Sequence, residues 1–153
     1  MPKVVKSVLV PHSVEMMFDL VDAVERYPEF LPWCGGTKVL MRDATQTIAT
    51  INIRYAGVSQ AFTTVNTREQ YEWMHLSLRD GPFKQLQGHW HFVVLADDAC
   101  KVELQLEYSF TNIVLERAIG PVFGMITDTL MDRFVARAEA LAAQQNTPGN
   151  QHG

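Results

Sequence analysis

The sequence predicts an α+β fold in which a curved antiparallel sheet wraps around one long C-terminal helix. Two patterns carry this prediction. Through the middle of the chain apolar and polar residues alternate, which is typical of strands with one buried and one solvated face. After Asn112 the apolar residues recur every three to four positions, which is typical of an amphipathic helix. With 153 residues, the chain is long enough to bury a core of its own.

The N-terminal part begins with an apolar stretch at residues 4–10, which we interpret as the first strand. Ser13 can cap a helix whose apolar positions recur at helical spacing until Pro28 ends it. In the segment YPEFLPWC, residues 27–34, we expect one compact helical turn that Pro28 opens and Pro32 ends. Because connecting segments are normally polar, this apolar segment is either a plug that seals the core or a lid over a cavity.

The central strands are predicted from three alternating segments. The clearest is KVELQLEYSFT at residues 101–111, and the same pattern occurs in TIATINIRY at 47–55 and YEWMHLSLRD at 71–80. Glycine, aspartate and proline mark the turns between the strands. Together with residues 4–10, we expect about seven strands connected as a meander.

The C-terminal helix is predicted from one apolar face, formed by Ile119, Phe123, Ile126, Leu130, Phe134, Ala138 and Leu141. Pro121 is expected to be the first helical residue, with a separate turn before it. A sheet curved around a single helix tends to leave a cavity with apolar walls, where small molecules bind. Residues 1–144 are predicted to form one domain, and the polar residues 145–153 a disordered tail.

Composition argues against several classes of function. The formal net charge is −4 and the basic residues are scattered, so we predict no DNA binding, although a local patch for one specific partner stays open. No apolar run approaches the ~18 residues of a membrane helix and the N-terminus lacks a signal-peptide pattern, so a cytoplasmic protein is predicted. Cys34 and Cys100 fit free thiols of a reducing compartment, and a disulfide between them stays open.

Residues that could carry chemistry are few. The motifs G-x-S-x-G, H-E-x-x-H, G-x-G-x-x-G and the P-loop do not occur. His89 and His91 share one face of a predicted strand, and His75 on another strand is the one candidate for a third metal ligand. Histidines on the polar face of a strand are usually solvated, so we predict no metal site and no catalytic residue.

The segment DGPFKQLQGHWHF, residues 80–92, concentrates apolar residues instead. Phe83 lies beside a turn, and Leu86 and Trp90 share one face of the following strand, with Gly88 between them. A glycine inside a strand marks either a bend of the sheet or a place where another group approaches the backbone closely.

Three segments carry a resemblance to a known family: YPEFLPWC, DGPFKQLQGHWHF and, near the C-terminus, FTNIVLERAIGPVFGMITDTLMDRFVARA. They resemble the coenzyme-Q-binding START-like family of the polyketide cyclase (SRPBCC) superfamily, whose bacterial members include ribosome association toxins. The likeness runs from about residue 3 to residue 143. It implies the helix-grip (START/Bet v 1-like) fold, with two short helices after the first strand. It also implies a non-catalytic binding or chaperone protein that holds ubiquinone or a related isoprenoid lipid and supports respiratory electron transport.

The resemblance implies partners and leaves alternatives open. No cofactor is required, and ubiquinone or another prenyl lipid is the bound ligand. A transient contact with the surface of the inner membrane is compatible with this function. The alternative function is binding of the large ribosomal subunit, which hinders subunit joining; Lys3, Lys6, Lys38 and Arg42 are the loose candidates for that contact. A distant alternative is a cyclase-like enzyme, which would need a buried polar pair such as Tyr55 and Tyr108.

The expected ligand site consists of apolar residues from the sheet, the helix and the lid. The sheet is expected to contribute Ile51, Ile53, Tyr55, Phe83, Leu86, Trp90, Phe92, Leu106, Tyr108 and Phe110, the helix Phe123, Ile126 and Leu130, and the lid Phe30, Leu31 and Trp33. Burying an apolar tail contributes ~25 cal/mol per Å², so such a site can bind without ionic contacts.

Overall fold

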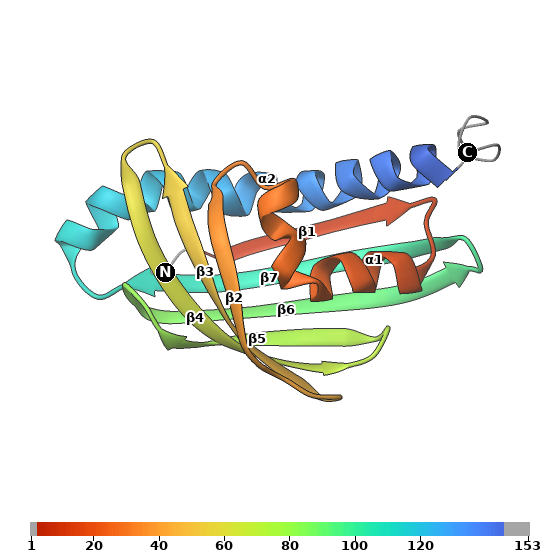
Figure 1. Ribbon diagram of the computed structural model, residues 1–153, viewed down its shortest axis with the longest axis horizontal. Helices are drawn as coiled ribbons and strands as arrows, with labels where there is room; N and C mark the ends of the chain where they lie inside the picture. Colours follow the sequence, from red (N-terminus) through yellow and green to blue (C-terminus); the bar gives the residue numbers. More distant parts are fainter. Residues whose placement is uncertain (1–2, 146–153) are drawn as a thin grey trace.

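Seven antiparallel strands form one sheet that curves around a long helix in the computed structural model, which describes residues 3–145 (Figure 1). The elements in chain order are β1 (Lys3–Val10), α1 (Val14–Asp22), the 3-10 helix η1 (Val24–Glu29), β2 (Cys34–Arg42), β3 (Gln46–Tyr55), β4 (Val58–Glu69), β5 (Trp73–Asp80), β6 (Phe83–Ala96), β7 (Ala99–Phe110) and α2 (Ile113–Gln145). The predicted helix-grip fold is confirmed. Of the predicted tail at residues 145–153, Gln145 is instead the last residue of α2, and residues 146–153 lie outside the described residues.

The sheet is a meander with one added strand. Strands β2 to β7 follow one another in space as they do in sequence, and β1 pairs with β7 to give the order β1-β7-β6-β5-β4-β3-β2. Three connections are two-residue loops, and in the one between β3 and β4 both residues, Ala56 and Gly57, have positive φ, at 50° and 83°. That conformation matches the right-handed twist of the flanking strands.

The predicted first helix is divided into two elements, α1 and the 3-10 helix η1. Ser13 caps α1 as predicted, with its side chain accepting a hydrogen bond from the Met16 amide at 3.1 Å. However, α1 ends at Asp22 because Ala23 leaves the helical region, with φ −82° and ψ 67°. The chain then continues as η1, and Pro28 lies inside η1. The expectation that Pro28 opens a separate turn of residues 28–31 was therefore wrong.

The start of α2 was also predicted wrongly, because Pro121 lies inside the helix and the first helical residue is Ile113. The Asn112 side chain caps this earlier start by accepting a hydrogen bond from the Leu115 amide at 2.9 Å. The first two turns are largely exposed, so the apolar periodicity becomes visible only from Ile119 onwards.

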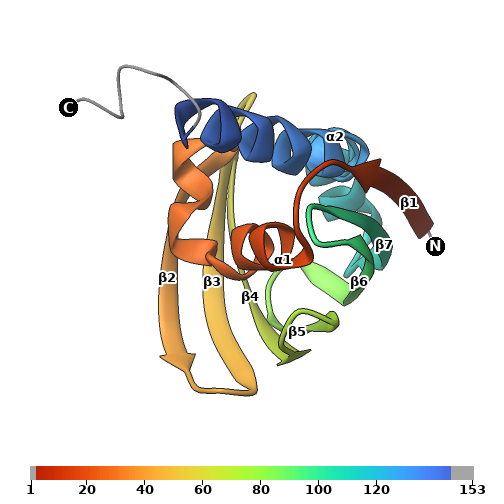
Figure 2. The same ribbon diagram turned by 90° about the vertical axis from the view of Figure 1, so that its right-hand side faces the viewer.

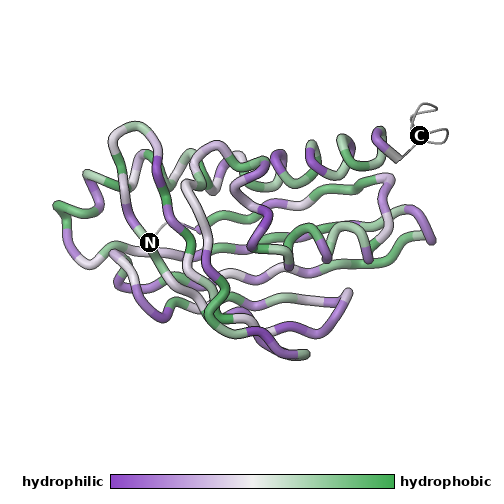
Figure 3. The backbone as a smooth tube through the Cα atoms, viewed as in Figure 1, coloured by the Kyte–Doolittle hydropathy of each residue, from purple (hydrophilic) through white to green (hydrophobic). Residues whose placement is uncertain are grey.

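The core lies between α2 and the concave face of the sheet. Figure 2 shows the sheet as a half-open barrel with α2 along its upper side and α1 within its opening. The apolar face of α2 is buried at Ile119, Phe123, Ile126, Phe134 and Ala138. Apolar and polar segments alternate along both the strands and the helix (Figure 3). Within the described residues, neither helix combines the length and the apolar character that crossing a membrane requires.

Candidate functional site

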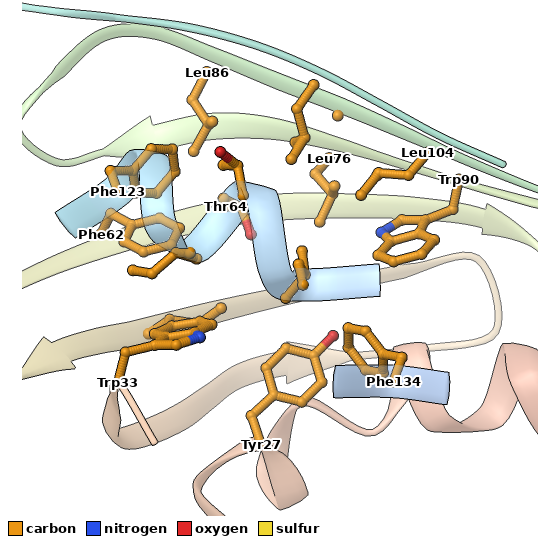
Figure 4. Close-up of a pocket in the computed structure, with 16 residues that line it drawn as sticks. Tyr27, Trp33, Phe62, Thr64, Leu76, Leu86, Trp90, Leu104, Phe123 and Phe134 are labelled. Atoms are coloured by element: carbon orange, nitrogen blue, oxygen red, sulfur yellow. The ribbon is translucent and has the colours of Figure 1, made fainter. Parts of the chain in front are cut away.

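An apolar cavity of about 80 Å³ lies between α2 and the concave face of the sheet (Figure 4). Its lining comes from η1, the following loop, five strands and the helix. The lining residues are Tyr27, Trp33, Ile51, Phe62, Thr64, Leu76, Leu86, Gly88, Trp90, Leu104, Leu106, Phe123, Ile126, Thr127, Leu130 and Phe134. The lining contains no carboxylate, histidine, lysine or arginine, so the cavity offers apolar contact and a few neutral polar groups.

Gly88 gives the cavity room at the centre of the sheet. It lies opposite Leu76 on β5 and Leu106 on β7 in regular register, so β6 is not bulged at this position. A methyl group at Gly88 would lie 2.4 Å from Leu76 Cδ1 and 2.8 Å from Leu106 Cδ2. Of the two interpretations of this glycine, the close approach of neighbouring side chains is the one observed.

Clusters of aromatic rings lie on two opposite sides of the cavity (Figure 4). On one side Phe83 packs against Phe62, Phe110 and Phe123, with ring centroids between 4.8 and 5.7 Å apart. On the other side the Phe134 ring of α2 meets three rings at 5.4–5.5 Å between centroids; they belong to Tyr27, Phe30 and Trp90. The 27–34 segment therefore contributes Tyr27 and Phe30 to the second of these aromatic clusters.

The 27–34 segment is fastened by backbone and side-chain contacts. Leu31 donates its amide to the Tyr27 carbonyl at 2.9 Å, and Cys34 donates its amide to the Leu31 carbonyl at 3.0 Å. Leu31 and Trp33 are buried, at 1% and 4% exposed, while Phe30 is half-buried. Arg137 of α2 donates to Glu29 at 2.7 Å and places its guanidinium 5.3 Å from the centre of the Phe30 ring.

The hydroxyl groups of the lining already donate to protein oxygens. Thr64 donates to the Asn66 side chain at 2.8 Å, and Thr127 donates to the Gly124 carbonyl at 3.0 Å. The Tyr27 hydroxyl donates to the Val21 carbonyl, and burial raises the pKa of Tyr27 far above its usual value. Such pairing removes the cost of about 1–3 kcal/mol that an unpaired buried polar group carries.

Half of the predicted site residues line the cavity. These are Trp33, Ile51, Leu86, Trp90, Leu106, Phe123, Ile126 and Leu130. Six further predicted residues are buried beside it or half-buried without lining it, namely Phe30, Leu31, Ile53, Phe83, Phe92 and Phe110. Tyr55 was assigned to the wall wrongly, because this last residue of β3 is 43% exposed and does not line the cavity.

The polar pair considered for a cyclase does not form in the cavity. Tyr108 is buried against the rings of Phe83, Phe110 and Phe123 and is not among the lining residues. Since Tyr55 is exposed, the two hydroxyl groups are not brought together on the cavity wall.

Several lining residues were missed by sequence reasoning. Phe62 and Thr64 lie on β4, whose alternation was not used, although both fall on one face of VSQAFTTVNTRE. Leu76, Leu104 and Phe134 were on predicted apolar faces but were not assigned to the wall. Tyr27, Gly88 and Thr127 also line the cavity and were not predicted.

Three of the five histidines gather on the outer face of the sheet. His75 lies opposite His89 in register, with ring centroids 6.2 Å apart, and the His91 ring is 6.4 Å from that of His89. Trp73 stacks on His89 at 6.4 Å. Over residues 3–145, no group of three or more histidine, cysteine, aspartate or glutamate side chains has the arrangement of a metal site. Cys34 and Cys100 are both buried and unbridged.

Comparison with known proteins gives close relatives along most of the chain. Residues 10–135 match the family described as polyketide cyclase / dehydrase and lipid transport. The ribosome association toxin RatA of Vibrio cholerae is 43% identical over 139 residues, which cover 91% of this chain and 96% of that protein. The persistence and stress-resistance toxin PasT of Escherichia coli O6:H1 is 40% identical over 139 residues, covering 91% and 88%.

More distant similarities agree with the fold. The mitochondrial coenzyme Q-binding protein COQ10 homolog B of Xenopus laevis is 22% identical over 140 residues, which cover 89% of this chain and 57% of that protein. The crystal structure of the Zhui aromatase/cyclase from Streptomyces sp. R1128 has a TM-score of 0.79 at 12% identity, covering 90% of this chain and 93% of that chain. With the match over residues 10–135, the chain belongs to the polyketide cyclase / dehydrase and lipid transport family.

Proposed function

We propose that this protein is a cytoplasmic, non-catalytic regulator that binds the large ribosomal subunit and hinders subunit joining. The observation that carries the proposal is the 43% identity to a ribosome association toxin over 91% of the chain. An identity of this extent over nearly the whole chain favours a shared partner over a shared fold alone.

The basic residues do not supply an evident contact surface. Arg42 is paired with Glu25 through two hydrogen bonds of 2.6 and 3.1 Å, and Lys3 lies 3.6 Å from Glu107. The outer face of β5 and β6 is the better candidate, because it displays Trp73 and the three histidine rings beside a polar groove of about 260 Å³. Tryptophan and histidine rings stack on unpaired RNA bases.

Sucrose-gradient profiles test ribosome association. Overexpression of the wild-type protein is expected to lower the fraction of intact ribosomes and to bring the protein into the large-subunit fractions. Trp73→Ala should weaken both effects, whereas Tyr55→Ala, which removes an exposed aromatic residue at the end of β3, should not. Unchanged profiles with no co-migration of the wild-type protein would contradict the proposal.

A second proposed function is the binding of an apolar ligand, an isoprenoid quinone or a related lipid, in the cavity. The lining of aromatic and aliphatic side chains supports it. At about 80 Å³ the cavity is smaller than the ~300–1,000 Å³ of pockets that hold drug-sized ligands, so binding requires it to widen. The 27–34 segment is the proposed lid, because it lines one side of the cavity and is held to α2 by Arg137.

Ligand content is measured on the protein purified from its host. Extraction with organic solvent followed by mass spectrometry is expected to release a prenyl quinone or another prenyl lipid. Detection of none, together with no uptake of added ubiquinone, would rule out this function while leaving ribosome association untouched.

A further inference from the structure

The indole nitrogen of Trp33 is a buried donor on the cavity wall. The side chain is 4% exposed, and among the residues that the structure describes Nε1 has no hydrogen-bond partner. Figure 4 shows this nitrogen on the edge of the ring that faces the middle of the cavity. Buried polar groups in proteins are nearly always paired, so an unpaired one on the wall of a cavity points to a ligand.

The hydroxyl groups of the lining do not compete for this role. The hydroxyl groups of Tyr27, Thr64 and Thr127 each donate to a protein oxygen. An indole N–H can only donate, so its partner must be an acceptor. The Trp33 indole N–H therefore needs a hydrogen-bond acceptor that these protein groups do not provide.

The backbone holds Trp33 firmly in this position. Its carbonyl accepts a hydrogen bond from the Arg54 amide of β3 at 2.9 Å, and the following residue, Cys34, is bonded to Leu31 at 3.0 Å. These bonds fix the backbone of Trp33 at the junction between the 27–34 segment and the sheet, and packing holds its buried side chain, which is 4% exposed.

We propose that Trp33 is a specificity-determining residue, which donates a hydrogen bond from Nε1 to a carbonyl-type oxygen of the ligand. This inference rests on the proposed binding of an apolar ligand in the cavity. It narrows the ligand class to apolar molecules that carry an acceptor oxygen, such as a quinone ring, and it disfavours pure hydrocarbons of the same shape. A ligand without an acceptor would leave the indole N–H buried and unpaired.

Two probes of matched shape test this inference. Tetramethylbenzoquinone carries two carbonyl oxygens, and its fully substituted ring does not add to the thiols of Cys34 and Cys100. Tetramethylbenzene has the same methyl groups and no oxygen. Binding of both is measured to the isotope-labelled full-length protein by NMR, in which the indole N–H groups of Trp33, Trp73 and Trp90 give separate signals.

The quinone is expected to move the Trp33 indole proton downfield, as hydrogen-bond formation does, and the hydrocarbon is not. Trp33→Phe keeps an aromatic ring but removes the donor, so it should weaken quinone binding about fivefold and leave hydrocarbon binding unchanged. Trp73→Phe is the matched control, since Trp73 lies on the outer face of the sheet, and it should change neither affinity.

The outcomes separate the two proposals. Suppose that both probes bind the wild-type protein. If saturation with the quinone then leaves the Trp33 signal in place, or if Trp33→Phe lowers the affinity for both probes equally, the proposed role of Trp33 is wrong, whereas ligand binding in the cavity stands. If neither probe binds the wild-type protein, ligand binding in the cavity is itself contradicted. The wild-type signal decides the question even if Trp33→Phe does not fold.

Discussion

Gly88 shows at the scale of one residue how tightly the sheet side of the cavity is constrained. Because Leu76 Cδ1 and Leu106 Cδ2 would lie within 2.8 Å of an added methyl group, we expect Gly88→Ala to lower the free energy of unfolding by about 1–3 kcal/mol. Urea denaturation measures this change.

Gly124 provides the control for that measurement. It lies inside α2, and a methyl group there would meet nothing within 4 Å. Alanine favours the helix over glycine, so Gly124→Ala should raise the free energy of unfolding by up to about 1 kcal/mol. Equal effects at the two glycines would contradict the close approach at Gly88.

His89 gives the outer face a dependence on pH. Partial burial lowers its pKa in the folded protein, and the neighbouring His75 and His91 lower it further, while Glu103 acts in the opposite direction. Below the unfolded-state pKa of about 6.5 the unfolded chain therefore takes up a proton that the folded protein resists. The associated stability is present above this pH and is lost as the pH falls through the folded-state pKa.

We expect His89→Gln to flatten the dependence of stability on pH between about pH 5 and 7. Thermal unfolding of the wild type and the variant across this range measures the difference. A variant whose stability falls with acidity as steeply as that of the wild type would show that other groups cause the dependence.

At the scale of elements, the joint between η1 and α2 decides whether the 27–34 segment can act as a lid. Arg137 reaches Glu29 and the Phe30 ring from α2, and its ion pair with Glu29 joins the two helices. Arg137→Met keeps the apolar stem but removes the charge. It should speed hydrogen exchange of the Leu31 and Cys34 amides and leave the amides of β7 unchanged.

Arg133→Met, at an exposed position of the same helix, is the control and should leave exchange in the 27–34 segment unchanged. Mass spectrometry of exchanged peptides gives the comparison. If Arg137→Met speeds exchange across the whole chain, the contact supports global stability and the segment behaves as a plug rather than a lid.

At the scale of the whole molecule, the fold was predictable because strands and helices with one buried face carry apolar residues at regular spacing in the sequence. The alternation of residues 101–111 and the helical spacing from Ile119 both report which face meets the core. The start of α2 was not predictable in this way, since its first turns are exposed and carry no such period, and Pro121 suggested a later start.

The cavity was predictable only in part, because lining residues and core residues have the same chemistry. Leu86 and Trp90 were assigned to the wall correctly, but Phe83 and Phe92 share their face and pack beside the cavity instead. Whether an inward residue meets a cavity or another side chain depends on the curvature of the sheet, which alternation does not encode. The unpaired donor of Trp33 likewise depends on which atoms surround it in three dimensions.

Sedimentation of the purified protein with separated ribosomal subunits tests the proposed ribosome association most directly. We expect the protein to co-sediment with the large subunit and not with the small one, and Trp73→Ala to reduce the bound fraction. Co-sedimentation with neither subunit, or with both to the same extent, would contradict the proposed function.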